Sequence, residues 1–312
     1  MSEFSSEPIL SVSLPIYNGE NHMREALDSI LNQTFRDFEL IISDNASTDA
    51  TQEICEDYAS RDSRIRYYRN DENIGATSNF IRAFELSKGK YFKWVGHDDI
   101  LDPTLLEKCL NALIDREEDG YVCCWPNTIV IDVNSEFVRK VVEPPMKLES
   151  DVLHERFRDG TYAHHSSFQF YGIIRSDVLR ETCVMGPWIC SDYTVIGQLA
   201  MRGKIYLHPE YLHKRRYQSR DGYESYEEDF YSYAKFWVHP SKKDDILLPY
   251  WKMAYEAGKG VMKAPMPITD RIMCLWHVAS SRHRLGRGFS QYFRDIVHAF
   301  KELMQKLFGS KD

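Results

Sequence analysis

The chain has 312 residues, 43% of them hydrophobic and 28% charged, which is the composition of an ordinary soluble globular protein with one large domain or two unequal ones. Its formal net charge of −8 argues against a protein that coats nucleic acid, because such a protein needs a basic surface. The sequence holds no apolar run near the roughly 20 residues that span a bilayer and starts without the basic and apolar segments of a signal peptide, so we expect a cytoplasmic protein.

Strand and helix patterns alternate along the first part of the chain. Runs rich in β-branched and aromatic residues predict strands at Ile9–Leu14, Phe38–Ser43, Ile65–Tyr68, Tyr91–Val95 and Val122–Val133, with Pro15 ending the first. Apolar residues at helical spacing predict helices at Glu20–Gln33, Asp49–Ala59, Ala76–Leu86 and Thr104–Leu113. The short connections between them predict a parallel sheet with helices on both faces.

The alternation loosens after about Ser150. Helical patterns recur at Asp151–Arg158, Ser191–Arg202, Glu224–Val238 and, with frequent Arg and Lys, Thr269–Phe308. The seven cysteines form neither a CxxC pair nor a zinc-binding spacing, and their apolar neighbours favour buried free thiols over disulfides.

Polar clusters follow each of the first four predicted strands. They are Pro15–Glu20, Asp44–Asp49, Asp71–Gly75 and His97–Asp99. In open α/β sheets, ligands bind outside the carboxyl ends of the strands. We therefore expect these four loops to converge on one edge of the sheet and to form a binding site there.

Two adjacent carboxylates, Asp98 and Asp99, stand at the end of the fourth predicted strand. They repel each other and are costly to bury unless a cation offsets their charge. Carboxylate oxygens suit Mg²⁺ or Mn²⁺, which would in turn hold substrate phosphates. The alternative is a solvated pair that caps the next helix.

Several other polar residues have both a functional and a structural interpretation. Asp44 can bind a base or ribose, but Asp-Asn-Ala-Ser is also good turn chemistry. Asn73–Gly75 offers flexible backbone beside a helix start, which suits a diphosphate. Asp192 can act as a general base for an acceptor hydroxyl or as a helix N-cap. His164 and His165 can ligate a metal, touch the acceptor, or be ordinary loop residues.

Competing nucleotide-dependent and hydrolytic folds lack their signatures. A GxGxxG motif opens none of the predicted helices, and the sequence contains no GxSxG elbow. Gly197–Lys204 has the wrong glycine spacing for a phosphate-binding loop, and Ile205 replaces the required Ser or Thr. Dehydrogenase, P-loop and serine-hydrolase interpretations are weakened accordingly.

Taken together, the motifs resemble family 2 of the inverting glycosyltransferases, which have the GT-A fold. The matching residues, within about the first 115 positions, are Ser13–Asn18, Glu20, Gln33–Thr34, Phe38–Asp49, Asn73–Gly75, Asn79 and Asp98–Leu101 ahead of Pro103. The resemblance implies an α/β, Rossmann-like and mostly parallel mixed sheet flanked by helices, with a helical C-terminal extension. The implied division is a GT-A domain over 1–220, with a nucleotide-sugar half at 1–115 and an acceptor half at 116–220, and a helical region over 221–312.

A nucleoside diphosphate sugar, usually a uridine one, is the donor that the resemblance implies. Donor-binding roles fall on Pro15, Tyr17, Asn18, Glu20, Asp44, Asn45, Ser47, Asn73, Gly75, Asn79 and Asp98. Of these, Asp44 would meet the base and Asn73 would approach the diphosphate. Asp98 and Asp99 would hold Mn²⁺ or Mg²⁺, although Gly96 stands where family members often have a first acidic residue.

Two segments of the second half also resemble the family. Ser191-Asp192-Tyr193 is similar to the Glu-Asp motif whose Asp is the catalytic base, with Ser191 in place of Glu. Asp192 would therefore take the proton of the acceptor hydroxyl as that hydroxyl attacks the anomeric carbon from the opposite face, inverting it. Arg215–Ser219 resembles an Arg-x-His…Ser segment near the diphosphate, with Tyr217 in place of His.

The acceptor that the resemblance implies is a glycan or a lipid-linked molecule in bacterial-type surface polysaccharide or glycolipid assembly. The alternative function is a nucleotide-sugar-binding protein without catalysis, which the changes at Gly96 and Ser191 leave open and the retained aspartates disfavour. A nucleotidyltransferase would need a glycine-rich loop with a basic residue after the first strand, where this chain has Pro15–Asn18.

The tail from Asp270 to Lys306 interleaves apolar residues with Arg and Lys. Such basic amphipathic helices can lie on an anionic membrane surface, which would suit a lipid-linked acceptor and a peripheral place at the inner face of a membrane. The alternative is a helix pair packed on the catalytic domain or at a homodimer interface.

Overall fold

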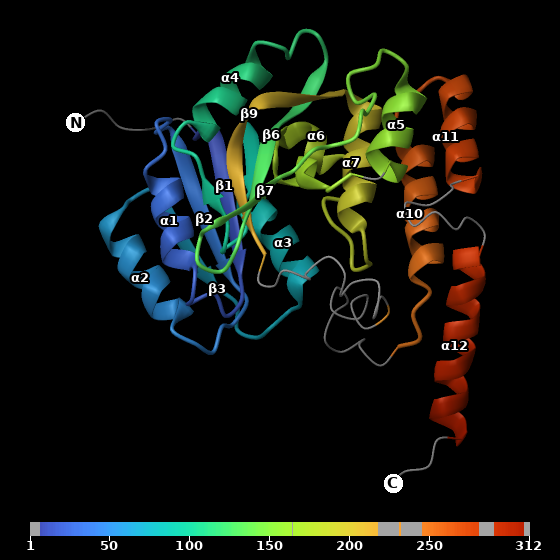
Figure 1. Ribbon diagram of the computed structural model, residues 1–312, viewed down its shortest axis with the longest axis horizontal. Coiled ribbons are helices and arrows are strands. Elements are labelled where there is room, and N and C mark those ends of the chain that lie inside the picture. The colour runs from blue at the N-terminus through green and yellow to red at the C-terminus, as the bar shows by residue number, and fades with distance from the viewer. Residues whose placement is uncertain (1–6, 164, 218–230, 232–244, 281–289, 309–312) are drawn as a thin grey trace.

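One mixed sheet with helices packed against it forms the body of the protein (Figure 1). The computed structural model describes residues 7–163, 165–217, 231, 245–280 and 290–308. Within these residues the sheet has nine strands in the order β3-β2-β1-β4-β8-β6-β9-β5, with β7 paired to β6. The predicted α/β class and the mixed sheet are confirmed.

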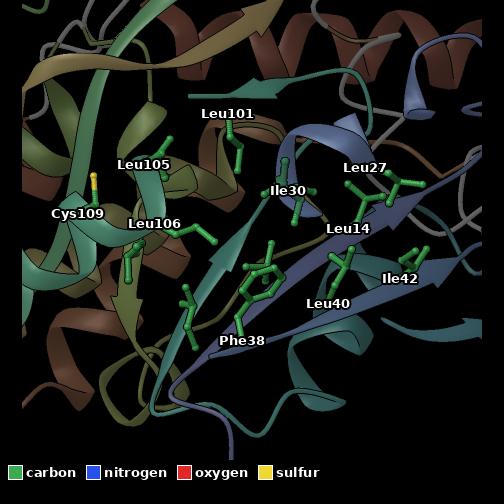
Figure 2. Close-up of a cluster of buried hydrophobic side chains, with 14 of the residues drawn as sticks. Leu14, Leu27, Ile30, Phe38, Leu40, Ile42, Leu101, Leu105, Leu106 and Cys109 are labelled. Atoms are coloured by element: carbon green, nitrogen blue, oxygen red, sulfur yellow. The ribbon is translucent and has the colours of Figure 1, made fainter. Parts of the chain in front are cut away.

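The parallel part of the sheet comes from the N-terminal part of the chain. Its strands are β1 (Leu10–Ile16), β2 (Phe38–Asp44), β3 (Ile65–Arg69) and β4 (Tyr91–Trp94). The helices between them are α1 (Met23–Leu31), α2 (Thr51–Arg61) and α3 (Ala76–Glu85). Every residue of β1 and β2 is buried, as expected for strands covered on both faces. Side chains such as Leu14, Leu27, Ile30 and Leu40 fill the core between sheet and helices (Figure 2).

The second part of the sheet contains antiparallel pairs. Its strands are β5 (Ile100–Leu101), β6 (Tyr121–Ile131), β7 (Phe137–Lys140), β8 (Ile173–Arg175) and β9 (Lys204–Arg216). Its helices are α4 (Leu105–Ile114), α5 (Leu153–Tyr162), the 3-10 turn η1 (Phe168–Tyr171), α6 (Ser176–Arg180) and α7 (Ser191–Arg202). Strand β8 joins the two parts because it pairs antiparallel with both β4 and β6.

Beyond α5 and α7, the described residues form three further helices at the margin of the molecule, two of them beside α5 and α7 (Figure 1). They are α10 (Pro249–Lys263), α11 (Ile268–Ser280) and α12 (Ser290–Phe308). A small core with Phe157, Met201, Val261 and Cys274 joins α10 and α11 to α5 and α7, and α12 packs against α10. Among the helices that the structure describes, none combines the length and the apolar content needed to cross a bilayer.

The prediction that Pro15 ends the first strand is wrong, because β1 continues to Ile16. Pairing between β1 and β4 stops at Ser13, whereas pairing with β2 continues to the end of β1. Pro15 therefore has a neighbouring strand on one side only, which is the position in a sheet that proline tolerates.

Helices α1 and α2 begin two or three residues later than the sequence pattern predicts. At the start of α2, Glu20 and Asp49 accept hydrogen bonds from outside the helix. The Glu20 carboxylate accepts the N–H of Ala50 at 2.9 Å, and Asp49 accepts the N–H of Thr51 at 3.0 Å. These bonds satisfy backbone donors that a helix leaves open at its N-terminus.

The elements that the sequence did not predict are mostly strands of the second part, namely β5, β7, β8 and β9, together with α6 and α10. Strand β9 is mixed in polarity and contains Pro209, so neither an alternating nor an apolar pattern marks it. The helix predicted at 224–238 lies outside the described residues except for Tyr231, which is helical. All seven cysteines are free, as predicted.

Candidate active site

The loops after β1 and β2 are hydrogen-bonded to each other. Asn18 has a left-handed backbone with φ of 52°, and its N–H donates to Ser47 Oγ at 3.0 Å. Its Oδ1 accepts the N–H of Thr48 at 2.8 Å. The N–H of Gly19 donates to Thr51 Oγ1 at 2.9 Å. The expected convergence of these two loops on one edge of the sheet is confirmed.

Tyr17, Asn18 and Glu20 are the exposed members of the predicted nucleotide-binding residues of the β1 loop, and Tyr17 has 44% of its surface accessible. Pro15 is buried within β1. Glu20 is exposed, but its carboxylate is engaged with Ala50 and its N–H donates to Asp49 Oδ2 at 3.2 Å. The loop therefore offers one free aromatic surface on a backbone fixed by polar contacts.

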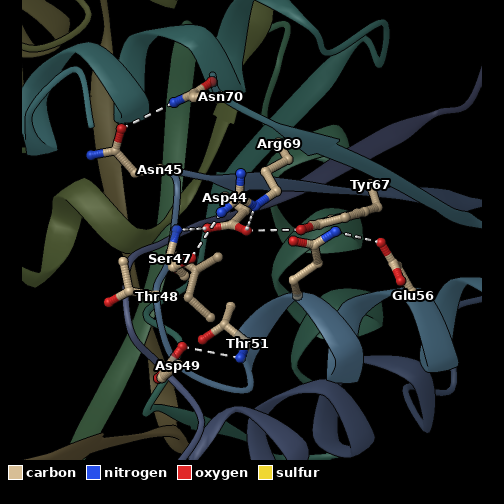
Figure 3. A network of polar contacts seen from close by, with 12 residues as sticks. Asp44, Asn45, Ser47, Thr48, Asp49, Thr51, Glu56, Tyr67, Arg69 and Asn70 are labelled. Carbon is tan, nitrogen blue, oxygen red and sulfur yellow. Dashed lines mark hydrogen bonds and ion pairs between the residues drawn. The ribbon is translucent and has the colours of Figure 1, made fainter. Parts of the chain in front are cut away.

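Asp44 is fully buried at the end of β2, where its carboxylate organises the loop that follows (Figure 3). Its Oδ1 accepts the N–H of Ser47 at 2.9 Å, and its Oδ2 accepts the hydroxyl of Tyr67 at 2.8 Å. Oδ2 also lies 3.4 Å from Nε of Arg69. Burial and the adjacent carboxylate raise the pKa of Tyr67, so the phenol stays protonated and donates. A nucleobase would reach Asp44 only by displacing one of these donors.

Four asparagines tie the loops after β2 and β3 to helix α3. Asn45 Oδ1 accepts from Asn70 Nδ2 at 3.0 Å, and Asn45 Nδ2 donates to Asn73 Oδ1 at 3.0 Å. Asn79 is buried in α3, where its Nδ2 donates to the carbonyl of Ser43 at 2.8 Å and its Oδ1 accepts from the Ser43 hydroxyl at 2.7 Å. Asn45 and Asn79 therefore hold the site together from within the fold.

Gly75 precedes the first residue of α3 with φ of 84° and ψ of 156°, a backbone conformation that side chains with a Cβ rarely adopt. Its N–H donates to Asn73 Oδ1 at 2.9 Å. The turn places the N-terminus of α3 at the same edge as the β1 and β2 loops. A helix N-terminus favours negative charge, as a diphosphate would supply.

Asp99 lies in a buried ion-pair cluster with residues of β9. Its Oδ2 accepts from Arg215 Nη1 at 2.7 Å and from His213 Nε2 at 3.2 Å, and its Oδ1 accepts the N–H of Arg216 at 3.3 Å. Burial alone would raise the pKa of Asp99, but Arg215 and His213 outweigh it and hold this pKa well below its usual range. Burial lowers the pKa of His213, so a neutral ring donates to the carboxylate.

Asp98 and Gly96 flank this cluster. The Asp98 side chain is half-buried, and its backbone carbonyl accepts from Arg216 Nε at 2.9 Å. A Cβ on Gly96 would lie 2.8 Å from Asp99 Oδ2, 3.0 Å from Asp98 Oδ1 and 3.1 Å from Arg215 Nη1. Glycine at position 96 thus has a physical reason, because a larger residue would push apart the two carboxylates and the guanidinium.

Asp192 is half-buried in the first turn of α7, and its Oδ1 accepts the N–H of Tyr193 at 3.0 Å. The N-cap position belongs to Cys190, so the N-cap interpretation of Asp192 is wrong. Burial raises the pKa of Tyr171, Arg215 opposes this shift, and the charges of Asp99, Asp192 and Asp98 add to it. One tyrosine therefore lies within electrostatic reach of all three predicted carboxylates.

Other sequence candidates have structural roles or fall outside the described residues. His165 is buried, with Nε2 3.2 Å from the carbonyl of Gly160 and Nδ1 accepting the N–H of Ser167 at 3.0 Å. His164, Gln218 and Ser219 lie outside the part of the chain that the structure describes.

The chemistry of the carboxylates fits a hard divalent cation held jointly with a ligand. Within the described residues there is no cluster of three or more His, Cys, Asp or Glu side chains that could hold a metal. Mg²⁺ and Mn²⁺, however, are commonly bound through one or two carboxylates together with substrate phosphates. Asp98 supplies a partly accessible carboxylate for that purpose, whereas both oxygens of Asp99 already accept hydrogen bonds.

The family resemblance placed Arg215 near the diphosphate, but the sequence did not predict which basic and aromatic residues pair with the buried carboxylates. Arg69 and Tyr67 alternate on β3 and both reach Asp44, while His213 and Arg215 alternate on β9 and both reach Asp99. Residues two apart on a strand share a face, so this spacing is a usable signal once the strand is known. For β9 the signal was lost because the strand itself was not predicted.

A model of glycosyl transferase family 2 matches residues 11–179 of the chain. An uncharacterized glycosyltransferase of Methanocaldococcus jannaschii is 27% identical over 257 residues, covering 80% of this chain and 86% of that protein. An uncharacterized glycosyltransferase of Rickettsia bellii is 34% identical over 148 residues, covering 47% of this chain. The chain spans 21% of the length of that R. bellii protein and 34% of the length of a similar one from R. typhi.

Two solved structures share the fold. TarS residues 1–349 of Staphylococcus aureus, in complex with UDP-GlcNAc, superposes with a TM-score of 0.58 at 17% identity, covering 96% of this chain and 82% of that one. A mannosyltransferase of Pyrobaculum calidifontis in complex with GDP-Man and Mn²⁺ gives a TM-score of 0.51 at 13% identity, covering 98% and 89%. At these identities the likeness concerns the fold, and the expected GT-A architecture is confirmed.

Proposed function

Because the chain belongs to glycosyltransferase family 2, we propose that it transfers a sugar from a nucleoside diphosphate sugar to a hydroxyl group with inversion at the anomeric carbon, assisted by a divalent cation. The observation that supports this proposal is the partly accessible Asp98 beside the ion pair of Asp99 and Arg215 after β4, together with the mutually hydrogen-bonded loops after β1 and β2. The expected donor carries a uridine nucleotide, and the expected acceptor is a glycan or a lipid-linked molecule.

The donor would lie across the carboxyl ends of β1 to β4. Tyr17 offers an exposed ring for stacking on the base, at the edge where Asp44 and Arg69 form their ion pair. The diphosphate would approach the turn at Asn73 and Gly75, where α3 begins. Support for this placement comes from the position of these residues at one sheet edge, with backbone held in place before any ligand arrives.

We assign Asp98 and Asp99 different tasks. Asp98 is the carboxylate that would hold Mn²⁺ or Mg²⁺, since it is partly accessible. A cation bound there offsets negative charge that grows on the departing diphosphate. Asp99 acts as a positioning residue, because it fixes Arg215 and His213 at the end of β9. Arg215 keeps part of its side chain accessible, at 25%, and can approach a phosphate while paired with Asp99.

Asp192 is the proposed catalytic base. It is half-buried in the first turn of α7, on a different element from Asp98 and Asp99, and would approach the acceptor side of a donor held at the sheet edge. A carboxylate there would take the proton of the acceptor hydroxyl while the new glycosidic bond forms and the bond to the diphosphate breaks. The displacement is direct, so inversion follows without a covalent intermediate on the protein.

A donor panel tests this function. The purified chain is incubated with UDP-glucose, UDP-N-acetylglucosamine and GDP-mannose, with Mn²⁺ or Mg²⁺ and with glycan and lipid extracts, and the released nucleoside diphosphate is measured. We expect release from one donor, its loss in EDTA, and its loss in Asp98→Ala. The matched control Asp177→Ala, an exposed aspartate on α6 outside the site, should leave release unchanged.

The outcomes separate the two candidate functions. Donor binding by calorimetry without release, even with the extracts present, would favour a nucleotide-sugar-binding protein. Failure to bind every donor on the panel would contradict both. Release that is insensitive to EDTA and to Asp98→Ala would retain the transferase and remove the cation from the proposal.

A further inference from the structure

Helix α12 carries its apolar side chains on its exposed face. Phe293 is 67% exposed and Phe300 61%, and the same helix exposes Ile296, Val297, Leu303 and Met304. These spacings of three, four and seven place them along one stripe of the helix. In an ordinary surface helix such a stripe faces the core of the protein, so α12 has the reverse arrangement.

A buried carboxylate fixes which side of α12 faces the body. Asp295 is fully buried. It accepts the N–H of Tyr250 at 2.8 Å and the N–H of Trp251 at 3.3 Å, and both donors lie in the first turn of α10. It also accepts the hydroxyl of Tyr231 at 3.1 Å. At 100° per residue, Phe293 and Phe300 lie about 150° around the helix from Asp295. The polar contact therefore turns the apolar stripe away from the protein.

The neighbouring helices also expose apolar side chains. In α11, Ile268, Ile272 and Trp276 recur every four residues, and Trp276 is 62% exposed. In α10, the exposed Trp251 and Tyr255 are also four residues apart. Both α11 and α12 pack against α10 and lie along the same margin of the molecule (Figure 1). We call the exposed apolar residues of α10, α11 and α12 the C-terminal apolar face.

The charge around this face is opposite to that of the rest of the chain. The described residues of 249–280 and 290–308 contain 7 Lys and Arg against 4 Asp and Glu, whereas the whole chain contains 39 against 47. On α12, Arg294 and Lys301 lie at the edge of the stripe, about 100° around the helix from its centre. Among the nearby acidic groups, Glu256 is already shared by Lys252 and Lys259, and Asp295 is buried.

We propose that the C-terminal apolar face binds the surface of an anionic phospholipid bilayer, with α12 lying in the plane of the interface. Phe and Ile side chains would enter the boundary between headgroups and acyl chains, Trp251 and Trp276 would lie at headgroup level, and the basic residues would meet lipid phosphates. A second copy of the chain fits less well, because pairing two such faces brings positive charges together. This partner is independent of the sugar donor.

Vesicle flotation with the full chain tests the proposal. The probes are vesicles of phosphatidylcholine alone and vesicles that contain about one-third phosphatidylglycerol, at low and high salt. We expect binding to the anionic vesicles, weakened by salt. The double variant Phe293→Ser/Phe300→Ser should lower the partition coefficient about tenfold or more, and Arg294→Glu/Lys301→Glu should abolish the preference for anionic lipid. The matched control is Phe137→Ser, which removes an equally exposed phenylalanine from β7.

Three results would overturn the proposal. One is absence of binding to either vesicle, and another is equal loss of binding in Phe137→Ser and in the α12 double variant. The third is a dimer, detected by light scattering, that the α12 double variant dissociates while neither form floats with vesicles. Circular dichroism confirms that each variant is folded, and nucleoside diphosphate release in solution shows whether the catalytic part is intact, so failure here is distinct from failure of the proposed transfer.

Discussion

The loops that follow β1 to β4 and the helices α10 to α12 differ in which kind of side chain they bury. In the loops, polar groups are buried and bonded to one another, as Asp44, Asn45 and Asn79 show. In the C-terminal helices, apolar side chains remain exposed. The loops are therefore organised before a ligand arrives, whereas the described C-terminal helices present exposed apolar side chains.

Two buried aspartates, one in each region, have pKa values shifted in opposite directions. Asp99 faces the guanidinium of Arg215, which with His213 holds its pKa well below the usual range. Asp295 faces two backbone N–H groups and a tyrosine hydroxyl, and burial raises its pKa to about 6 in spite of these donors. The guanidinium of Arg215, bonded directly to Asp99, outweighs desolvation there, whereas neutral donors and the weaker effect of Arg294 do not outweigh it at Asp295.

Breaking the ion pair of Asp99 should have the largest effect on stability. Asp99→Ala leaves the half-buried Arg215 without its charge partner and the buried His213 ring and Arg216 N–H without their acceptor, which costs about 3 to 5 kcal/mol of unfolding free energy. Urea denaturation measures the change. Asp177→Ala, which breaks the exposed pair with Arg175, should cost less than about 0.5 kcal/mol. Equal losses in the two variants would contradict the assigned role of Asp99.

The pH dependence of Asp295 should come next. Its pKa is higher in the folded chain than the ordinary 3.8, so its contribution to stability is fully present below about pH 4 and is lost as the pH rises through about 6. Relative to Asp295→Asn, the wild type should lose up to about 3 kcal/mol between these limits. Urea denaturation of both proteins from pH 4 to pH 7.5 tests the sign. A wild type that instead gains stability over this range would contradict it.

A smaller effect is expected at Gly75, on the loop side of the comparison. Gly75→Ala forces a Cβ into the conformation with φ of 84° and ψ of 156°, at a cost of about 1 to 3 kcal/mol. The turn leads into α3, so donor binding measured by calorimetry should weaken as well. Gly258→Ala in α10 is the control, since a Cβ there meets only Val278 Cγ1 at 4.0 Å. A stability loss no greater than the control would show that the turn is not strained.

The smallest effect should come from the C-terminal apolar face in the absence of lipid. Phe300→Ser is expected to change the unfolding free energy by less than about 0.5 kcal/mol, because the side chain is mostly exposed. Thermal unfolding with and without anionic vesicles gives the measurement. A loss of several kcal/mol without lipid would mean that the face is covered by protein.

The sequence predicts elements with an apolar pattern better than elements held by polar contacts. Strand β2 and helices α3 and α7 were predicted closely, because an apolar run or a helical repeat records burial directly in the sequence. Strand β9 was missed because its polar residues are satisfied by groups more than a hundred positions away, as Arg215 is by Asp99.

The site shows the same limit. The residues expected at the sheet edge do follow the strands. Their positions in the sequence did not reveal which of their side chains are already hydrogen-bonded to other residues of the protein. Asp98 and Asp99 are neighbours in sequence, but one is partly accessible and the other is closed in by β9. The roles assigned to the individual site residues remain predictions.

The most direct test of the proposed transfer is to measure both the turnover and the donor affinity of Asp192→Asn. We expect nucleoside diphosphate release in the presence of acceptor to fall about 10² to 10⁴-fold. Donor binding measured by calorimetry should be unchanged, because Asp192 acts on the acceptor proton and not on the donor. Unchanged turnover, or a loss of donor binding equal to the loss of turnover, would contradict the assignment of Asp192 as the base.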